Sequence, residues 1–386
     1  MFAGGLSFSS FVVSPEGEVV AFGLNCTDGL IGVRCGLLRN ALSVVFGGAA
    51  FEVTRPTLLQ RQWPEPAMIT CSGDNFSLLL DTEGGLWGCG RYSSEINATH
   101  FTPMRFGLPS QELPRFSYVA VGQYFWLAID SRGSVWAAMT NTRNRNEPAL
   151  GIGAGRASPS IQCIPDLPCV TKIACGARIS LLEAAEGSLW GSGFLSSDGP
   201  AWTKHQRLPT GAIAFPLRSL AVGRAFFAVV DSNGALWTFG DIHPPHQRAA
   251  APFPSTPLQH EELPPIQTAT AGDVHLLLLD EAGYVWSSGA NDSGQLGREG
   301  PPDRFLTINE IGGGNLAIAA GNQHSMVQSK EGILVFGKNV SGQLGLEGVE
   351  DRFIPTLLPG IQCRTPNREK IRPKSAYSSL PLDVPN

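Results

Sequence analysis

Short runs in which nearly every position is apolar recur along the whole chain. Residues 76–80, 125–129 and 226–230 are examples, and after each comes a turn glycine and then a second apolar run, such as residues 236–239. A strand with apolar side chains on both faces is buried on both faces. The link between the two runs is Asp-x-x-Gly or a close variant, in which Asp bonds the turn backbone and Gly adopts a positive φ. Each pair of runs therefore predicts a buried β-hairpin.

The hairpins recur at a nearly constant spacing. Seven copies are marked by a turn glycine, at Gly17, Gly84, Gly133, Gly187, Gly234, Gly283 and Gly332. These glycines are 67, 49, 54, 47, 49 and 49 residues apart. A period near fifty residues over a whole chain indicates an array of structural repeats.

Two further positions recur in register with the turn glycine. Three residues after it stands a large apolar residue, which is Trp87, Trp136, Trp190, Trp237 or Trp286 in five copies and Val20 or Val335 in the first and last. Eleven residues before it stands another glycine in six copies, namely Gly73, Gly122, Gly176, Gly223, Gly272 and Gly321. We expect these residues to be structural, with the tryptophans filling the space between neighbouring repeats.

A second kind of segment lies between the hairpins and contains proline, at residues 55–59, 102–106, 256–258 and 354–358. Proline loses no ladder hydrogen bond at a sheet edge, so these segments are predicted outer strands that complete four strands per repeat. Seven such repeats predict an all-β fold, a seven-bladed β-propeller. The chain starts with a hairpin (residues 1–23) and ends its pattern with an outer strand (residues 355–361). We therefore expect the N- and C-terminal segments to join in one blade, which closes the ring without a free edge.

The composition supports one domain. The chain has 386 residues with 45 Gly, 29 Pro and only 16% charged residues, which suits short strands and tight turns. We expect the propeller to span residues 1–362, with an apolar insertion at 33–51 that covers a blade or docks a partner. Residues 363–386 are expected to form a flexible, weakly basic tail. This tail is interpreted either as a solvated segment or as a weak nuclear-import or phosphate-binding signal.

Charge and cysteine usage narrow the class of protein. The net charge of −5 gives no global field that attracts nucleic acid, so we expect no nucleic-acid or chromatin binding. There is no convincing secretion signal and no apolar run long enough to span a bilayer, which favours a cytoplasmic or nuclear location. The eight cysteines show no CxxC pair and are expected to be reduced, buried thiols. A zinc site at Cys163, Cys169 and Cys175 is the alternative, but the spacing is not a standard one.

The motifs of common enzymes are missing. The sequence has no phosphate-binding loop, no His-Glu-x-x-His and no Gly-x-Ser-x-Gly at a strand end, so we predict no catalytic residue, metal or cofactor, and enzymatic activity stays an open question. His275 and His324 occupy a repeat position that other copies fill with Phe, which indicates packing. His243 and His246 flank two prolines, which favours a stiff exposed loop over a metal pair.

The copies at residues 271–297 and 320–345 carry a specific combined pattern. It consists of the leading glycine with a following His, the turn glycine, and a closing Asn-x-x-Gly-Gln-Leu-Gly. This pattern resembles the repeat of the RCC1 (regulator of chromosome condensation) family. The likeness covers roughly residues 1–362; residues 25–32 keep a degraded closing motif, and the middle copies have lost it. The resemblance implies a seven-bladed propeller whose faces and inter-blade loops bind proteins. The family's founding member is an exchange factor for the small GTPase Ran and sits on nucleosomes, although its basic N-terminal tail has no counterpart here.

These observations predict a protein-protein interaction propeller, a scaffold or adaptor that works as a monomer. The alternative is a guanine-nucleotide exchange factor for a Ran-like or other small GTPase, which would act by favouring the nucleotide-free state. A substrate-recruiting subunit of a ubiquitin ligase is a third hypothesis. The candidate partner-binding residues lie in loops after the tryptophan strands: Arg91, Arg143, Arg145, Asp241, His243, His246, Asn291 and Asp292.

Overall fold

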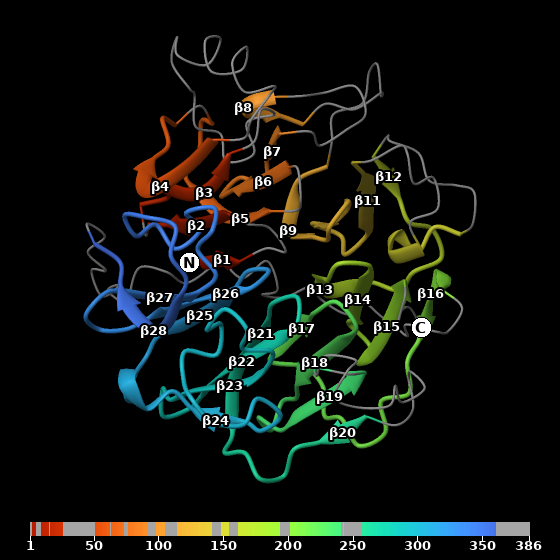
Figure 1. The fold of residues 1–386 in the computed structure, drawn as a ribbon. Coiled ribbons are helices and arrows are strands. Elements are labelled where there is room, and N and C mark those ends of the chain that lie inside the picture. The colour runs from red at the N-terminus through yellow and green to blue at the C-terminus, as the bar shows by residue number, and fades with distance from the viewer. Residues whose placement is uncertain are drawn as a thin grey trace, which may run out of the picture.

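The computed structural model shows a ring of antiparallel sheets (Figure 1). It describes residues 2–4, 9–14, 16–25, 51–61, 63–72, 76–90, 98–104, 114–140, 148–153, 161–193, 201–240, 242 and 257–359. Within these residues the strands form seven four-stranded sheets, here called blades one to seven in chain order. The all-β, seven-bladed prediction is confirmed.

Each blade is built from four consecutive strands. Blade one consists of β1 (Phe2–Gly4), β2 (Ser9–Val13), β3 (Val19–Asn25) and β4 (Phe51–Leu58). Blade two consists of β5 (Ala67–Ser72), β6 (Phe76–Asp81), β7 (Leu86–Gly90) and β8 (Ala98–Pro103). Blade three consists of β9 (Phe116–Val121), β10 (Phe125–Asp130), β11 (Val135–Met139) and β12 (Gln162–Cys163). Blade four consists of β13 (Val170–Cys175), β14 (Ile179–Ala184), β15 (Ser188–Gly193) and β16 (Trp202–Arg207).

Blades five to seven follow the same plan. Blade five consists of β17 (Ser219–Val222), β18 (Phe226–Val230), β19 (Leu236–Gly240) and β20 (Leu258–Gln259). Blade six consists of β21 (Ile266–Ala271), β22 (His275–Asp280), β23 (Val285–Gly289) and β24 (Leu306–Thr307). Blade seven consists of β25 (Ala317–Ala320), β26 (His324–Gln328), β27 (Ile333–Gly337) and β28 (Arg352–Leu357). The described residues also contain two short 3-10 helices, η1 (Pro148–Leu150) and η2 (Asn309–Ile311).

The first strand of each blade lies nearest the axis of the ring. These strands contact one another in a closed circle, from β1 through β5, β9, β13, β17, β21 and β25 back to β1. The fourth strands, β4, β8, β12, β16, β20, β24 and β28, lie on the outside of the ring (Figure 1). The proline-containing outer strands therefore sit where the sequence predicts them.

The expected joining of the two chain ends in one blade is wrong. Blade one takes all four strands from residues 2–58, and blade seven takes all four from residues 317–357. Strand β28 pairs with β27, with Val335 opposite Thr356, so it completes the hairpin before it rather than the hairpin at the start of the chain. The ring therefore closes by packing of blade seven against blade one, without a shared sheet.

The hydrophobic core lies in the seams between blades. Among the described residues each seam has its own cluster; at the seam of blades two and three, Phe76 and Leu78 pack with Phe116 and Trp126. The seam of blades seven and one is built the same way, with Val12 and Phe22 against Met326, Val335 and Leu344. A blade surrounded by other blades buries both faces of its middle strands, which is why all six residues of β6, β10 and β22 are buried.

The hairpin turn is held by its aspartate. In blade six, Asp280 Oδ1 accepts hydrogen bonds from the backbone N–H groups of Ala282 (2.9 Å) and Tyr284 (2.8 Å), and Oδ2 accepts one from the indole Nε1 of Trp286 (2.9 Å). The same three bonds are made by Asp81, Asp130 and Asp231 in blades two, three and five. The aspartate and the tryptophan six residues later therefore act as a pair.

Copies without this pair use serine. In blade one Ser14 holds the turn by accepting from the N–H of Glu18 (3.1 Å), and in blade four the indole of Trp190 donates to Ser188 Oγ (2.8 Å). In blade seven the turn is one residue shorter, so Leu334 pairs across the hairpin with Val327 at the position equivalent to the tryptophans. The alignment of Val335 with that position was therefore off by one residue.

Candidate functional site

The leading glycine makes room for the ring that follows it. A Cβ on Gly122 would lie 2.1 Å from Phe125 Cε1, and a Cβ on Gly272 would lie 2.1 Å from His275 Cε1. Gly223 and Gly321 stand in the same relation to the rings of Phe226 and His324, while Gly176 packs against the carbonyl oxygen of Gly223 in the next blade. Gly73 lies outside the described residues. Phenylalanine and histidine thus fill the same packing position.

The histidines at this position also bond to the next blade. Ser10 in blade one donates its hydroxyl proton to the carbonyl of Gln343 (2.8 Å), which leaves its oxygen to accept from His324 Nε2 (2.8 Å) in blade seven. Ser325 does the same between the carbonyl of Gln295 (2.8 Å) and His275 Nε2 (3.0 Å). We call each His–Ser–carbonyl unit a latch, and it ties two neighbouring blades together.

The latch histidines are held neutral. Both rings are fully buried, and this desolvation lowers the pKa of His275 to about 3 and that of His324 to about 4; for His275 the proximity of His324 lowers the pKa further. A neutral ring bonded to a serine through Nε2 is suited to holding structure across the ordinary pH range.

A third latch lies where the sequence shows no closing motif. Ser180 in blade four donates to the carbonyl of Ala149 in η1 (2.5 Å) and lies 3.1 Å from His205 Nε2. The segment at η1 thus supplies a carbonyl equivalent to that of the glutamine in the closing motif. One of the middle copies therefore keeps a latch although it lacks the motif. Sequence reasoning missed it because Ala149 stands where the other copies have glutamine, and His205 comes from the outer strand β16 instead of the usual position.

Most predicted binding-loop residues lie outside the described residues: Arg91, Arg143, Arg145, Asp241, His243 and His246. Asn291 and Asp292 are described. Asn291 shapes its own loop, since Oδ1 accepts from the N–H of Leu296 (2.9 Å) and Nδ2 donates to the carbonyl of Arg298 (3.1 Å). Asp292 is exposed beside it. The structure therefore gives Asn291 a structural role and leaves Asp292 as a candidate for partner contact.

Other sequence-based expectations are only partly covered. Nearly all of the 33–51 insertion and all of the 363–386 tail lie outside the described residues. Cys163 and Cys169 are exposed, so the expectation of buried thiols is wrong for these two. The described part of the chain contains no group of three His, Cys, Asp or Glu side chains placed to hold a metal ion. None of its helices has the length and apolar character needed to cross a membrane.

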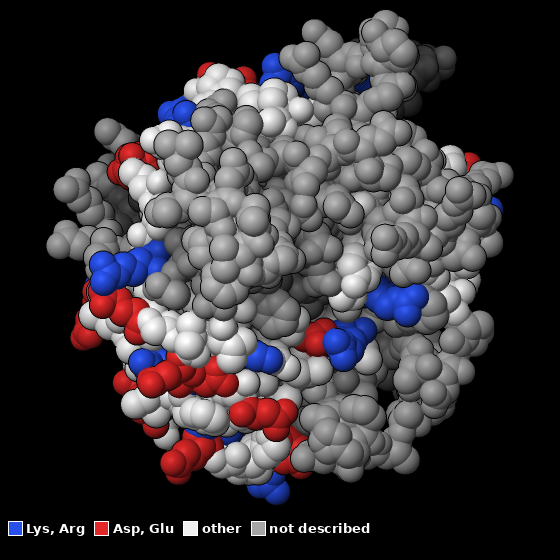
Figure 2. All heavy atoms as spheres, turned by 45° about the horizontal axis from the view of Figure 1, so that its top comes forward, with Lys and Arg blue, Asp and Glu red and all other residues white. Residues whose placement is uncertain are grey.

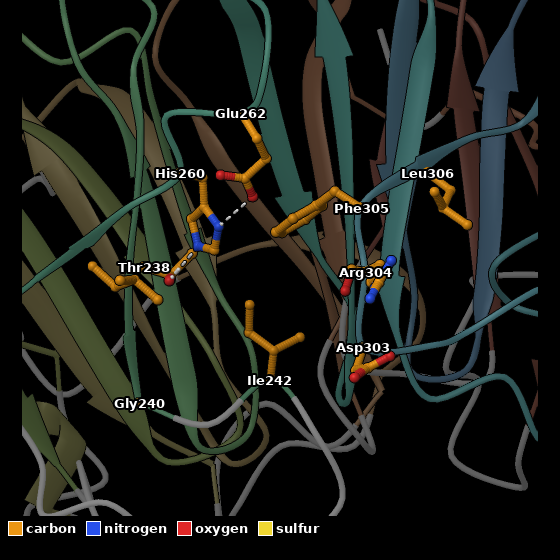
Figure 3. A pocket seen from close by; sticks show the side chains of 11 residues that line it. Thr238, Gly240, Ile242, His260, Glu262, Asp303, Arg304, Phe305 and Leu306 are labelled. Atoms are coloured by element: carbon orange, nitrogen blue, oxygen red, sulfur yellow. Dashed lines mark hydrogen bonds and ion pairs between the residues drawn. The ribbon is translucent and has the colours of Figure 1, made fainter.

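A pocket of about 500 Å³ opens between blades five and six (Figure 3). Its walls come from the outer halves of both blades, with Thr238 and Leu258 on one side and Phe305 and Leu306 on the other. The rings of His260 and Phe305 meet edge to face, with centroids 5.0 Å apart. The sequence gives no signal for this pocket, because its walls belong to two different repeats.

His260 is fixed at the mouth of this pocket. Its Nδ1 lies 3.3 Å from Glu262 Oε1, and its Nε2 lies 2.8 Å from Thr238 Oγ1. A carboxylate only accepts, so Nδ1 carries the proton in the first contact, and the second contact joins Nε2 to the threonine hydroxyl. The pocket therefore has one wall that is rigid and polar and another that is aromatic.

Comparisons of sequence give distant relatives. No family model matches the chain. The mouse secretion-regulating guanine nucleotide exchange factor is 27% identical over 257 residues, which cover 61% of this chain and 52% of the relative. The RCC2 homolog of Xenopus laevis is 27% identical over 278 residues, which cover 67% of this chain and 48% of the relative. The chain spans about half the length of the curated relatives it matches.

Comparisons of structure give the same family of folds. Human WBSCR16 has a TM-score of 0.71 at 18% identity, covering 88% of this chain and 93% of that protein. Prp20p from Saccharomyces cerevisiae, the yeast RCC1, has a TM-score of 0.69 at 18% identity, covering 84% of this chain and 81% of that protein. Together with the seven blades, the leading glycines and the closing motifs, these likenesses show that the chain has the seven-bladed β-propeller fold of the RCC1 structures and resembles RCC1 proteins in sequence.

Proposed function

We propose that the chain is a protein-interaction propeller that acts as a scaffold or adaptor. The observation that carries this proposal is the ring itself, in which latches and seam clusters hold the blades while loops and the pocket between blades five and six are displayed on the outside. A rigid scaffold with surface loops is an arrangement that proteins often use for recognition.

Several finer statements belong to this proposal. We propose one propeller over residues 1–362, with the insertion at 33–51 and the tail at 363–386, working as a monomer in the cytoplasm or the nucleus. One relative, an RCC1 domain-containing protein of Arabidopsis thaliana, is mitochondrial. A fusion of the full chain to a fluorescent protein, imaged with organelle markers, tests the location.

Guanine-nucleotide exchange is the second candidate function. It is favoured by the likeness to the mouse secretion-regulating guanine nucleotide exchange factor and to Prp20p, which has binding properties to Gsp1p and histones. An exchange factor needs no covalent chemistry, because a surface that binds the nucleotide-free GTPase more tightly than the loaded form promotes release.

Two measurements on the full chain separate these functions. Affinity capture from a native lysate, followed by reconstitution from purified components, tests for a stable partner. A panel of small GTPases loaded with a fluorescent guanine nucleotide tests for release. A stoichiometric partner with unchanged nucleotide release supports the scaffold, and accelerated release from one GTPase supports the exchange factor. The scaffold proposal fails if no purified protein binds.

A further inference from the structure

The negative charge of this protein is concentrated in its last blades. Residues 257–359 contain 13 Asp and Glu but only five Lys and Arg, a net charge of −8 in a chain whose total is −5. In Figure 2 acidic side chains gather over the lower left of the molecule, the part formed by blades six and seven. A surface of this kind attracts and orients partners of opposite charge.

The pocket between blades five and six lies at one end of this acidic region. Glu262 and Asp303 both line it and are exposed, and Arg304 is the one cation among its lining residues, so its formal charge is −1 with His260 neutral. Its apolar walls are Phe305, Ile242 and Leu258, the last with 61% of its surface exposed.

The wall that carries Asp303 and Phe305 is built around a buried arginine. Arg298 is 5% exposed, and its guanidinium donates to the carbonyls of Ser287 (2.7 Å), Glu299 (3.1 Å) and Arg304 (2.8 Å), and to Ser287 Oγ (2.9 Å). Burial lowers the pKa of Arg298. The oxygens that accept these hydrogen bonds are carbonyl and hydroxyl oxygens, which carry no charge. Blade seven has Leu346 after the same closing motif, so this support differs between the two blades that keep that motif.

We propose that this pocket binds a lysine or arginine side chain of a protein partner. Such a side chain has an apolar stem and a charged head. The stem would lie along Leu258 and Ile242, the charged head would approach Glu262 and Asp303, and the face of Phe305 would attract the cation. His260 holds Glu262 in place at the mouth, and Arg298 is a positioning residue that fixes the loop. The inference rests on the proposed interaction function and names the chemistry of the partner.

A pair of labelled peptides tests the proposal on the full chain. The probe contains four arginines separated by Gly-Ser, and its control replaces each arginine by citrulline, which keeps the shape and removes the charge. Fluorescence anisotropy gives the Kd of each. We expect the arginine peptide to bind at least tenfold more tightly than the citrulline peptide, and the difference to shrink as salt rises. Equal binding of the two peptides, or binding of neither, would show that the pocket does not select a positive charge and would overturn the proposal.

Matched variants separate the pocket from the general acidic surface. Glu262→Gln with Asp303→Asn should weaken the arginine peptide about tenfold, and Phe305→Ala should weaken it about two- to fivefold. The control Glu310→Gln with Glu331→Gln removes the same charge from exposed positions outside the pocket and should change the Kd less than twofold. Equal losses in both double variants would show attraction by net charge alone, which contradicts the pocket.

Arg298→Met tests the positioning role separately. It leaves the buried oxygens that the guanidinium bonds without a donor, so we expect a lower unfolding midpoint. At a temperature at which the variant is fully folded, we expect weaker arginine-peptide binding with unchanged citrulline-peptide binding. Unchanged binding of both peptides would contradict the positioning role. A failure of these tests is distinguishable from a failure of the proposed function. A captured partner that binds the pocket variant as tightly as the native chain would reject the pocket and keep the interaction function.

Discussion

Asp280 shows how one side chain serves the turn and the space between blades at once. Its carboxylate bonds two backbone N–H groups of its own hairpin and the indole of Trp286, which packs against the cluster between blades five and six. Blade one, where Val20 replaces the tryptophan, has Ser14 in place of the aspartate. The two positions are therefore coupled, because the indole requires an acceptor and the carboxylate requires donors.

Asp280→Ala should lower the free energy of unfolding by about 2–3 kcal/mol, since it leaves buried donors without a partner. Asp292→Ala, at an exposed position, is the control and should change it by less than about 0.5 kcal/mol. The double change Asp280→Ser with Trp286→Val imitates blade one and should cost less than the sum of the single changes. Urea unfolding of the native chain, the two alanine variants, the two single changes and the double change measures these differences, and strict additivity would contradict the coupling.

The latch histidines make stability depend on pH. The pKa of His324 is lowered to about 4 in the folded protein, against 6.5 in an unfolded chain. Between these values the unfolded state binds a proton that the folded state does not, so stability decreases as the pH falls through this window. The loss reaches about 1.4 kcal/mol per pH unit for one histidine.

His324→Phe, which places the residue of blades two, three and five at this position, should therefore flatten the dependence of stability on pH between 4 and 6.5 by about one proton. His260→Phe is the control at a histidine outside the latches. Urea unfolding at pH 5 and pH 7 gives the slopes. An unchanged slope in His324→Phe would mean that this histidine is protonated in the folded protein.

At the scale of elements, the seam between blades seven and one differs from the other six. The chain crosses every other seam when it passes from one blade to the next, but blades seven and one come from opposite ends of the described chain and share no sheet. The Ser10 latch, the cluster around Phe22 and the ion pair of Arg55 with Glu347 (2.9 Å) span it. The ion pair is exposed and therefore contributes little, so the latch and the cluster contribute most of the stability of this seam.

Ser10→Ala and Ser325→Ala form a matched pair, because each removes a serine that bonds one histidine and one carbonyl. We expect Ser10→Ala to speed hydrogen exchange in both β2 and β26 more than Ser325→Ala speeds it in β22 and β26, since only the first opens a seam without chain connection. Mass spectrometry of exchange resolves these strands. Equal effects would indicate that the closing seam is no weaker than the others.

The elements also show what could be predicted from the sequence. Glycine, aspartate and tryptophan at fixed offsets report a hairpin buried on both faces, and this sufficed for seven blades. The partner of an outer strand is not encoded in spacing: residues 352–357 could follow their own hairpin or meet the one at residues 9–25, and the pattern fits both. Spacing also does not show that the hairpin turn of blade seven is one residue shorter than the others. Because of this shorter turn, Leu334 and not Val335 takes the tryptophan position.

At the scale of the whole molecule, the contacts that hold the ring together lie apart from the surfaces that we propose for recognition. Clusters and latches occupy the seams, while the acidic surface of blades six and seven and the pocket beside His260 face outward. The sequence could not predict the pocket, since Thr238 and Phe305 lie in different repeats and come together only when blades five and six pack. Six of the eight candidate loop residues lie outside the described residues, so their role stays a prediction.

The most direct test of the account is hydrogen exchange on the full chain, alone and in a complex reconstituted with a captured and purified partner. We expect binding to slow exchange in surface segments of the propeller, including residues 258–262 and 303–306 around the pocket, and to leave exchange in the buried strands of the seams unchanged. Protection confined to residues 363–386 would contradict it, because the propeller would then not be the part that binds.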